Sequence, residues 1–246
     1  MNVCEERCWV MKRLHQLYDG QSKIVYATDE PDMVMLSFKD EATCYGGLKR
    51  ARISGKGAVC NQVSNHLMRI LEKNGIPTHY VEEVSETDTL VKKIRLLPIA
   101  VICRNRVAGT LAGRLGVPDG TPLPHPIIEF HYRGADLNDR LVNEYHITAM
   151  GWGNRAVLAE ITAMAEKINS ILKQVYLNAG IELVDMGLEF GFTLDGTVVL
   201  GDELSPDTSR LWDSRTHEKL DKDRFRRDLG DVEEAYQEVL HRLMGE

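Results

Sequence analysis

The stretch IELVDMGLEFGFTLDGTVVLGDEL, residues 181–204, limits the fold of this chain more than any other part of it. Two runs rich in apolar residues flank the dipeptide Asp195-Gly196, and this arrangement predicts a β-hairpin. Asp-Gly favours a two-residue turn, because both central positions of that turn need positive φ. A two-residue turn would place Glu189 directly opposite Asp202 on the neighbouring strand.

The pairing expected in this hairpin predicts a site for a cation. Asp185 lies on the same strand face as Glu189, and Asp202 would join them from the second strand. Like charges that face one another destabilise a sheet, so three carboxylates on one face need a cation. Carboxylate oxygens without His or Cys suit Mg²⁺, which often shares one or two carboxylates with nucleotide phosphates. A solvated acidic hairpin that binds no metal is the alternative interpretation.

Charge and cysteine content narrow the classes of function. The net charge of −7 and the pI near 5.7 argue against a nucleic-acid-binding protein, which is usually basic. No apolar run approaches the roughly 20 residues of a membrane span, and the N-terminus lacks the apolar core of a signal peptide. The five cysteines are odd in number and form no CxxC motif, which indicates reduced thiols. We therefore expect a cytoplasmic protein without nucleic-acid or membrane partners, and we expect a homo-oligomer.

Periodicity along the chain predicts an α+β fold. Apolar residues at helical spacing indicate helices within residues 57–75, 152–180 and 232–243. Two strands are expected around Leu96-Leu97-Pro98, where we place a domain junction. The predicted parts are an extension, an N-terminal lobe and a C-terminal lobe, over residues 1–16, 17–97 and 98–246.

Four motifs resemble one known family. They are LVDMGLEFG, VVLGDELSPDTSRLWD, CRNRVAGTLAGRLG and EKLDKDRFRRDLG, within a resemblance that runs from about Leu17 to about Leu243. The family is SAICAR synthetase, and the resemblance implies two lobes with antiparallel sheets and an ATP cleft between them. It also implies ATP-dependent amide formation in de novo purine biosynthesis. The carboxylate of carboxyaminoimidazole ribotide would be joined to L-aspartate through an acyl phosphate.

The same resemblance implies a role for individual residues. Those expected at ATP are Gly20, Gln21, Ser22, Lys23, Arg133 and Glu189. Those expected at the ribotide are Arg104, Thr110, Arg210 and Arg226. Glu189 and Asp202 would hold Mg²⁺, and the expected catalytic residues are Asp185, Lys222 and Asp223. Lys49, Arg50, Arg52 and Lys56 form a basic cluster. The resemblance implies that this cluster belongs to a flexible loop over the site, and the alternative interpretation is a solvated loop.

Several positions in or beside these motifs depart from the family. They are Gln21 and Gly187 where the family has Lys, Gly46 where it has Asn or Asp, Asn138 where it has His, and Arg140 where it has Pro. These departures keep two alternatives open. One is a paralogue that joins a different amine or nucleoside carboxylate in specialised nucleoside biosynthesis, and the other is a nucleotide-binding pseudoenzyme. For Gly187 we expect space that admits a different substrate group, so that aspartate ligation would be slow.

Overall fold

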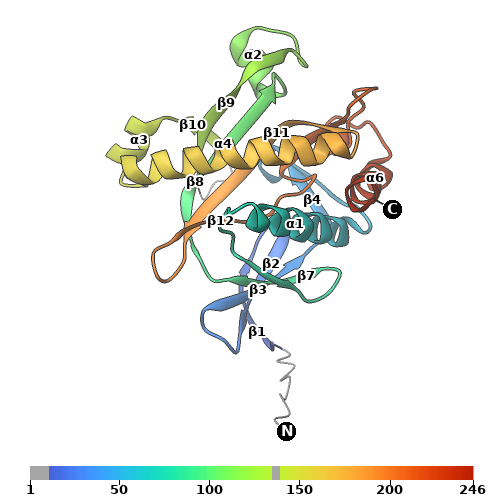
Figure 1. Cartoon of the computed structure of the whole chain (residues 1–246). Coiled ribbons are helices and arrows are strands. Elements are labelled where there is room, and N and C mark those ends of the chain that lie inside the picture. The colour runs from blue at the N-terminus through green and yellow to red at the C-terminus, as the bar shows by residue number, and fades with distance from the viewer. Residues whose placement is uncertain (1–10, 135–138, 246) are drawn as a thin grey trace.

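The computed structural model describes residues 11–134 and 139–245, and two antiparallel sheets dominate it (Figure 1). The five-stranded sheet has the order β1 (Arg13–Asp19), β2 (Lys23–Thr28), β3 (Met33–Phe38), β7 (Asp88–Lys92) and β6 (Tyr80–Glu83). The six-stranded sheet has the order β10 (Asp139–Val142), β9 (Pro122–Arg133), β8 (Arg95–Arg106), β11 (Ile181–Phe192) and β12 (Val198–Gly201), with β13 (Ser209–Asp213) also paired to β11. A separate hairpin consists of β4 (Glu41–Cys44) and β5 (Lys49–Arg52), joined by the 3-10 turn η1 (Tyr45–Gly47).

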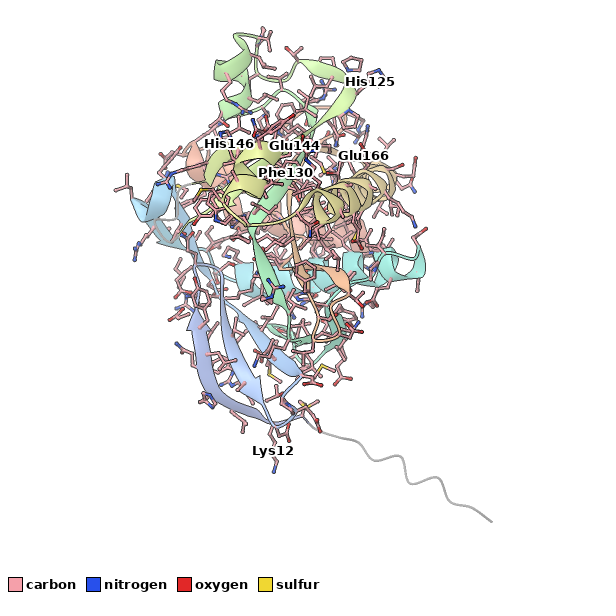
Figure 2. The ribbon with its side chains drawn as sticks, turned by 90° about the vertical axis from the view of Figure 1, so that its left-hand side faces the viewer. Lys12, His125, Phe130, Glu144, His146 and Glu166 are labelled. Carbon is pink, nitrogen blue, oxygen red and sulfur yellow. The ribbon has the colours of Figure 1, made fainter. Side chains whose placement is uncertain are left out.

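Three long helices cover these sheets. They are α1 (Lys56–Lys73), α4 (Arg155–Asn178) and α6 (Val232–Met244), and shorter helices are α2 (Thr110–Leu115), α3 (Glu144–Ala149) and α5 (Asp223–Arg226). Figure 1 shows α4 across the six-stranded sheet, where it contacts β8 and β11, and α1 between α4 and the five-stranded sheet. In Figure 2, Lys12 and His125 lie at opposite ends of the molecule, so the start of β1 and the β9 end of the second sheet are far apart.

Helical periodicity explains why α1 and α4 pack where they do. On α1, the side chains of Val59, Val63 and Leu67 recur every four residues and are completely or almost completely buried. On α4, Ile161 and Ile168 have the same role, and all five residues belong to one continuous core. Each such aliphatic side chain contributes roughly 1.5–3 kcal/mol to folding. The two sheets are therefore joined through shared apolar helices.

The predicted hairpin is confirmed, but its predicted register is wrong. Glu189 pairs with Gly201 rather than with Asp202, because the turn has three residues, Leu194-Asp195-Gly196. The Thr193 amide donates to the Thr197 carbonyl at 3.0 Å, and within the turn only Gly196 has positive φ. A two-residue turn needs positive φ at two positions, whereas a three-residue turn needs it at one. The Asp195 carboxylate also accepts a hydrogen bond from the Thr197 amide at 3.2 Å, which stabilises the wider turn.

The stretch at residues 89–105 contains two strands, as predicted, but the break between β7 and β8 lies at Lys93-Ile94, and Leu96-Leu97-Pro98 lie inside β8. The pairing of β8 with β11 shifts between Glu189 and Gly191, and Pro98 lies at this irregularity. Proline lacks an amide hydrogen, so an irregular point in the ladder is where a strand tolerates it. The first strand, β1, begins at Arg13, inside the segment expected to be an extension. The division into two lobes near residue 97 remains a proposal.

None of the helices in residues 11–134 and 139–245 is both long enough and apolar enough to cross a membrane.

Candidate active site

A cavity of about 940 Å³ lies between the two main sheets and is also lined by the β4 and η1 segments. This volume is near the upper end of the range for small-molecule sites. Every residue that the sequence assigned to the site lines this cavity, except Asp223. The residues that the structure brings together are Gly20, Gln21, Ser22, Lys23, Arg104, Thr110, Arg133, Asp185, Glu189, Asp202, Arg210, Lys222 and Arg226.

At one end of the cavity, Lys23 faces two carboxylates. Its ammonium lies 2.6 Å from Asp202 Oδ1 and 2.8 Å from Glu203 Oε1. Burial alone would lower the pKa of Lys23, but the attraction of the two carboxylates raises it well above its usual range. Ser22 also donates to Glu203 Oε1 at 2.8 Å, and Gly20 closes the β1–β2 turn by donating its amide to the Lys23 carbonyl. This turn therefore places a charged lysine and a hydroxyl at the cavity.

Beside this polar turn the cavity wall is apolar. The aliphatic side chains along it come mainly from β2, β3, β7 and the start of β8, and they include Val25, Val34, Leu36, Val91 and Leu96. A flat aromatic ring fits such a wall, while its charged substituents would reach the lysine end. The departure Gln21 lies at the same end, where its Oε1 accepts a hydrogen bond from the Thr43 hydroxyl at 2.6 Å.

The two carboxylates predicted to hold Mg²⁺ both line the cavity, although they do not face each other in the sheet. Glu189 Oε1 lies 2.9 Å from Arg133 Nη1, and Asp202 lies against Lys23. Burial alone would raise the pKa of Asp202, but the adjacent Lys23 lowers it. Asp202 has a positive φ of 55°, an unusual backbone conformation that often occurs at functional positions. Within the described parts of the chain, no three His, Cys, Asp or Glu side chains form a group that could hold a metal ion.

At the other end of the cavity, two arginines share one carboxylate. Asp185 Oδ2 accepts from Arg104 Nη1 at 3.0 Å and from Arg210 Nη1 at 2.8 Å. A second carboxylate holds each arginine from behind, because Arg104 Nε donates to Glu129 at 2.7 Å and Arg210 Nε donates to Asp223 at 2.9 Å. These planar guanidinium groups are therefore fixed along the wall, in an arrangement suited to a phosphate or carboxylate.

Gly109 explains why the CRNRVAG motif contains a glycine next to these arginines. Its φ is +59°, a conformation that other residues rarely adopt. A Cβ atom at this position would lie 2.6 Å from Arg210 Nη2, which is too close for any contact. The glycine thus permits the guanidinium of Arg210 to approach the backbone just before Thr110.

Glu129, a residue not predicted from the sequence, organises the arginine end. Besides Arg104, its carboxylate contacts Arg114 and lies 3.2 Å from His131 Nε2. Burial alone would raise the pKa of Glu129, but hydrogen bonds from His131 and the arginines lower it to about 2. A charged residue within the apolar strand PIIEFHY was the available signal.

Asp207 was also missed, and its position corrects the interpretation of Lys56. The Lys56 side chain is fully buried, and its ammonium lies 2.9 Å from Asp207 Oδ2. Lys56 is therefore part of the wall behind the cavity rather than of a solvated or flexible loop. Lys49, from the same basic cluster, lies 2.6 Å from Asp228 and donates to the Phe225 carbonyl at 2.6 Å.

Asp223 does not reach the cavity surface. It is almost fully buried, and its carboxylate holds Arg210 at 2.9 Å and Arg226 at 2.5 Å. Its amide donates to the buried Asp221 carboxylate at 2.6 Å. Burial, with repulsion from Asp223, raises the pKa of Asp221 to about 7. Asp223 thus orients two cavity arginines instead of meeting a ligand itself.

The positions that depart from the family have different surroundings. Gly187 lines the cavity between Asp185 and Glu189, and a Cβ atom there would lie 3.3 Å from the end of the Ile102 side chain. Gly46 also lines the cavity, in η1, and Arg140 is exposed in β10. Asn138 lies outside the described residues.

Comparisons with known proteins give one consistent result. The profile of the family described as SAICAR synthetase matches residues 16–243. The phosphoribosylaminoimidazole-succinocarboxamide synthase of Coprothermobacter proteolyticus is 50% identical over 95% of this chain and 99% of its own length. The crystal structure of the synthase of that name from Ehrlichia chaffeensis has a TM-score of 0.91 and 43% identity, and the match covers 94% of this chain and 98% of that one. A SAICAR synthetase in complex with ADP has a TM-score of 0.90 and 42% identity, over 93% of this chain and 97% of that one.

Proposed function

This chain belongs to the SAICAR synthetase family, and we propose from that membership how its cavity performs the family's reaction. The protein is an ATP-dependent ligase of de novo purine biosynthesis. It forms an amide between the carboxylate of carboxyaminoimidazole ribotide and the amine of L-aspartate. The observation that carries this function is identity of 50% along nearly the whole chain, together with a single cavity that gathers the four motifs. Because these relatives are named as synthases of this one reaction, the comparisons do not favour a paralogue that uses another amine, nor a pseudoenzyme.

The reaction has two balanced steps. An oxygen of the ribotide carboxylate attacks the γ-phosphorus of ATP, the bond from that phosphorus to the β–γ bridging oxygen breaks, and ADP leaves. The aspartate nitrogen then attacks the carbonyl carbon of the acyl phosphate, inorganic phosphate leaves, and the nitrogen loses a proton. Positioning of the reactants and stabilisation of negative charge are the contributions that a protein makes to such a transfer.

ATP is proposed to lie with its base against the apolar wall and its phosphates at the β1–β2 turn. Gly20 would keep this turn tight, Ser22 would offer its hydroxyl, and the Lys23 ammonium would move from Asp202 towards a phosphate oxygen. Gln21 would contribute a neutral donor where the family has a second lysine. The structural relative of TM-score 0.90 is a complex with ADP, which supports the binding of an adenine nucleotide. Arg133, at the cavity edge, would also face the nucleotide.

Mg²⁺ is proposed to be held by Glu189 and Asp202 together with ATP. Glu189 and Asp202 offer carboxylate oxygens, which Mg²⁺ prefers, and two protein carboxylates fit a cation that is shared with nucleotide phosphates. When bound, the ion would neutralise charge on the phosphates. Lys23 and Arg133 pair with these carboxylates in the structure, so they maintain the local charge balance.

The ribotide is proposed to bind at the arginine end. Arg104 and Arg210, fixed by Asp185, would hold an anionic group, and Thr110 would donate its hydroxyl beside them. Lys222 and Arg226 would complete the site for the substrate carboxylates. Asp185 and Asp223 would act by orienting the arginines, a narrower role than the catalytic one predicted. A homo-oligomer and a cytoplasmic location remain predictions.

A substrate panel tests this function. The purified protein is incubated with ATP, Mg²⁺, the ribotide and one of several amines, and the products are identified by mass spectrometry. We expect the succinocarboxamide ribotide to form with L-aspartate, at about 1–10³ turnovers per second. Efficient product formation with another amine, and slow formation with aspartate, would instead support the altered space at Gly187.

The Mg²⁺ assignment needs matched variants. Glu189→Gln and Asp202→Asn each remove a charge while keeping the shape of the side chain. Both should abolish turnover and weaken ATP binding in calorimetry when Mg²⁺ is present, with less effect when it is absent. Near-normal turnover of both variants at limiting Mg²⁺ would remove these two residues from the metal site.

A further inference from the structure

The Asp207 carboxylate lies at the cavity wall and is enclosed by donors from three distant parts of the chain. Its Oδ2 accepts from Lys56 Nζ, at the start of α1, at 2.9 Å and from Lys222 Nζ, just before α5, at 3.3 Å. Its Oδ1 accepts from the hydroxyl of Tyr236, on α6, at 2.6 Å. Of these residues, Asp207 and Lys222 line the cavity and the other two lie behind it.

Lys56 is the unusual member of this group. Its side chain has no exposed surface, and a buried ammonium is unfavourable unless a carboxylate pairs with it. Burial alone would lower its pKa, but the attraction of Asp207 raises it, so Lys56 is charged. The backbone fixes its direction, because a Cβ atom on the next residue, Gly57, would lie 2.8 Å from the Phe38 carbonyl oxygen. The start of α1 is thus packed tightly against the end of β3.

The arrangement divides the charge of Asp207 between two lysines. Lys56 is the closer one and is sealed from solvent, whereas Lys222 lies farther away and keeps 11% of its side chain exposed. An ammonium has three donors, and Lys222 directs one of them to Asp207. Lys56 and Tyr236 donate hydrogen bonds to the Asp207 carboxylate from the interior, so Asp207 holds Lys222 loosely. The remaining N–H donors of Lys222 can therefore bind an anion in the cavity.

We propose that Lys56 and Tyr236 are positioning residues for the ligase reaction, which hold the Asp207 carboxylate and thereby set the Lys222 ammonium at the cavity wall for a substrate anion. This inference rests on the proposed function. Without Lys56, the carboxylate would attract Lys222 alone and draw it away from the ligand. Without the Tyr236 hydroxyl, the carboxylate would lose the contact that fixes its rotation.

Tyr236→Phe removes one oxygen atom and is the milder test. We expect kcat/KM for the ribotide or for L-aspartate to fall about tenfold or more, the size of losing one hydrogen bond to a charged group, while the KM for ATP stays within about twofold. Tyr176→Phe is the matched control, since Tyr176 is equally buried and its hydroxyl makes no hydrogen bond among the described residues to the Asp207 carboxylate. Equal effects of both variants would overturn the proposal.

A double-mutant cycle separates positioning from a structural role. Lys56→Met and Lys222→Met are made singly and together, and kcat and each KM are measured for folded protein. If Lys56 acts through Lys222, the double variant should be no slower than Lys222→Met within about twofold. Effects that multiply would overturn the proposal, as would a large loss of ATP affinity in Lys56→Met.

An assay of the wild-type protein in parallel distinguishes a failure of the proposed function from a failure of the positioning roles of Lys56 and Tyr236. If it has no ligase turnover, the proposed function fails and the positioning roles fall with it. If it turns over and the cycle is multiplicative, the function stands and the positioning roles are wrong. Should Lys56→Met not fold, the cycle is run with Tyr236→Phe and Lys222→Met, and the same outcomes decide.

Discussion

Replacing Asp185 with Asn should destabilise the protein in a way that an anion repairs. The Asp185 side chain is almost fully buried and accepts bonds from Arg104 at 3.0 Å and Arg210 at 2.8 Å. A hydrogen bond to a charged group contributes about 1.5–3 kcal/mol. Because each arginine keeps a second carboxylate, we take the lower end for both bonds, a loss of about 3 kcal/mol. For a chain of this length, that loss lowers the Tm by roughly 6–12 °C.

Thermal melting with and without inorganic phosphate measures the repair. In Asp185→Asn two guanidinium groups face each other without their shared charge, so phosphate should bind there and raise the Tm more than in the wild type. Asp213→Asn is the control, because Asp213 is similarly buried and holds Arg242 at 2.8 Å, away from the cavity. Phosphate should raise the Tm of Asp213→Asn no more than it raises the Tm of the wild type. Equal phosphate shifts in both variants would refute an anion site at the arginines.

Three further changes probe other parts of the cavity. Lys23→Met should raise the Kd of ATP about tenfold or more in calorimetry, since it removes a charge-assisted contact, and unchanged affinity would exclude Lys23 from the nucleotide site. Gly109→Ala should weaken ribotide binding, because the added Cβ forces Arg210 aside. Gly113→Ala is the control, since its Cβ would meet no atom within 4 Å, and similar ribotide affinities of the two variants would show that residue 109 need not be glycine. The pKa of Asp221 is about 7 in the folded protein, which is higher than its value in the unfolded chain. The stability that protonated Asp221 contributes is therefore complete below pH ~4 and is lost as the pH rises through 7, and the total loss is roughly 4 kcal/mol. Denaturant unfolding at several pH values should show a weaker pH dependence for Asp221→Asn than for the wild type, and parallel curves would contradict the raised pKa.

Local patterns were sufficient to predict the main elements. The helices α1 and α4 follow from apolar side chains at helical spacing. The hairpin at Asp195-Gly196 was also predictable, but its register was not. A dipeptide does not reveal that the Asp195 side chain caps a three-residue turn, and one extra residue moves Asp202 out of line with Glu189.

The carboxylates Asp185, Glu189 and Asp202 were predicted from the strand pattern, whereas the rest of the site was predicted only from the family resemblance. Arg104, Arg210 and Lys23 were assigned from this resemblance, and the fold brings them to one cavity. The supporting residues were not found, because their partners are distant in the sequence. Lys56 follows a loop rich in Gly and basic residues, and nothing near it indicates that its ammonium meets Asp207, 151 positions later. Such contacts depend on how α1, α5 and α6 converge, which no local pattern specifies.

The fate of the carboxylate oxygen tests most directly whether this chain forms its amide through an acyl phosphate. Carboxyaminoimidazole ribotide labelled with ¹⁸O in its carboxylate is converted with ATP, Mg²⁺ and L-aspartate, and the phosphate and nucleotide products are analysed by mass spectrometry. The mechanism transfers one carboxylate oxygen to phosphorus, so each inorganic phosphate should carry one ¹⁸O atom and ADP should be unlabelled. Unlabelled phosphate at full amide formation, or ¹⁸O in AMP, would contradict the mechanism.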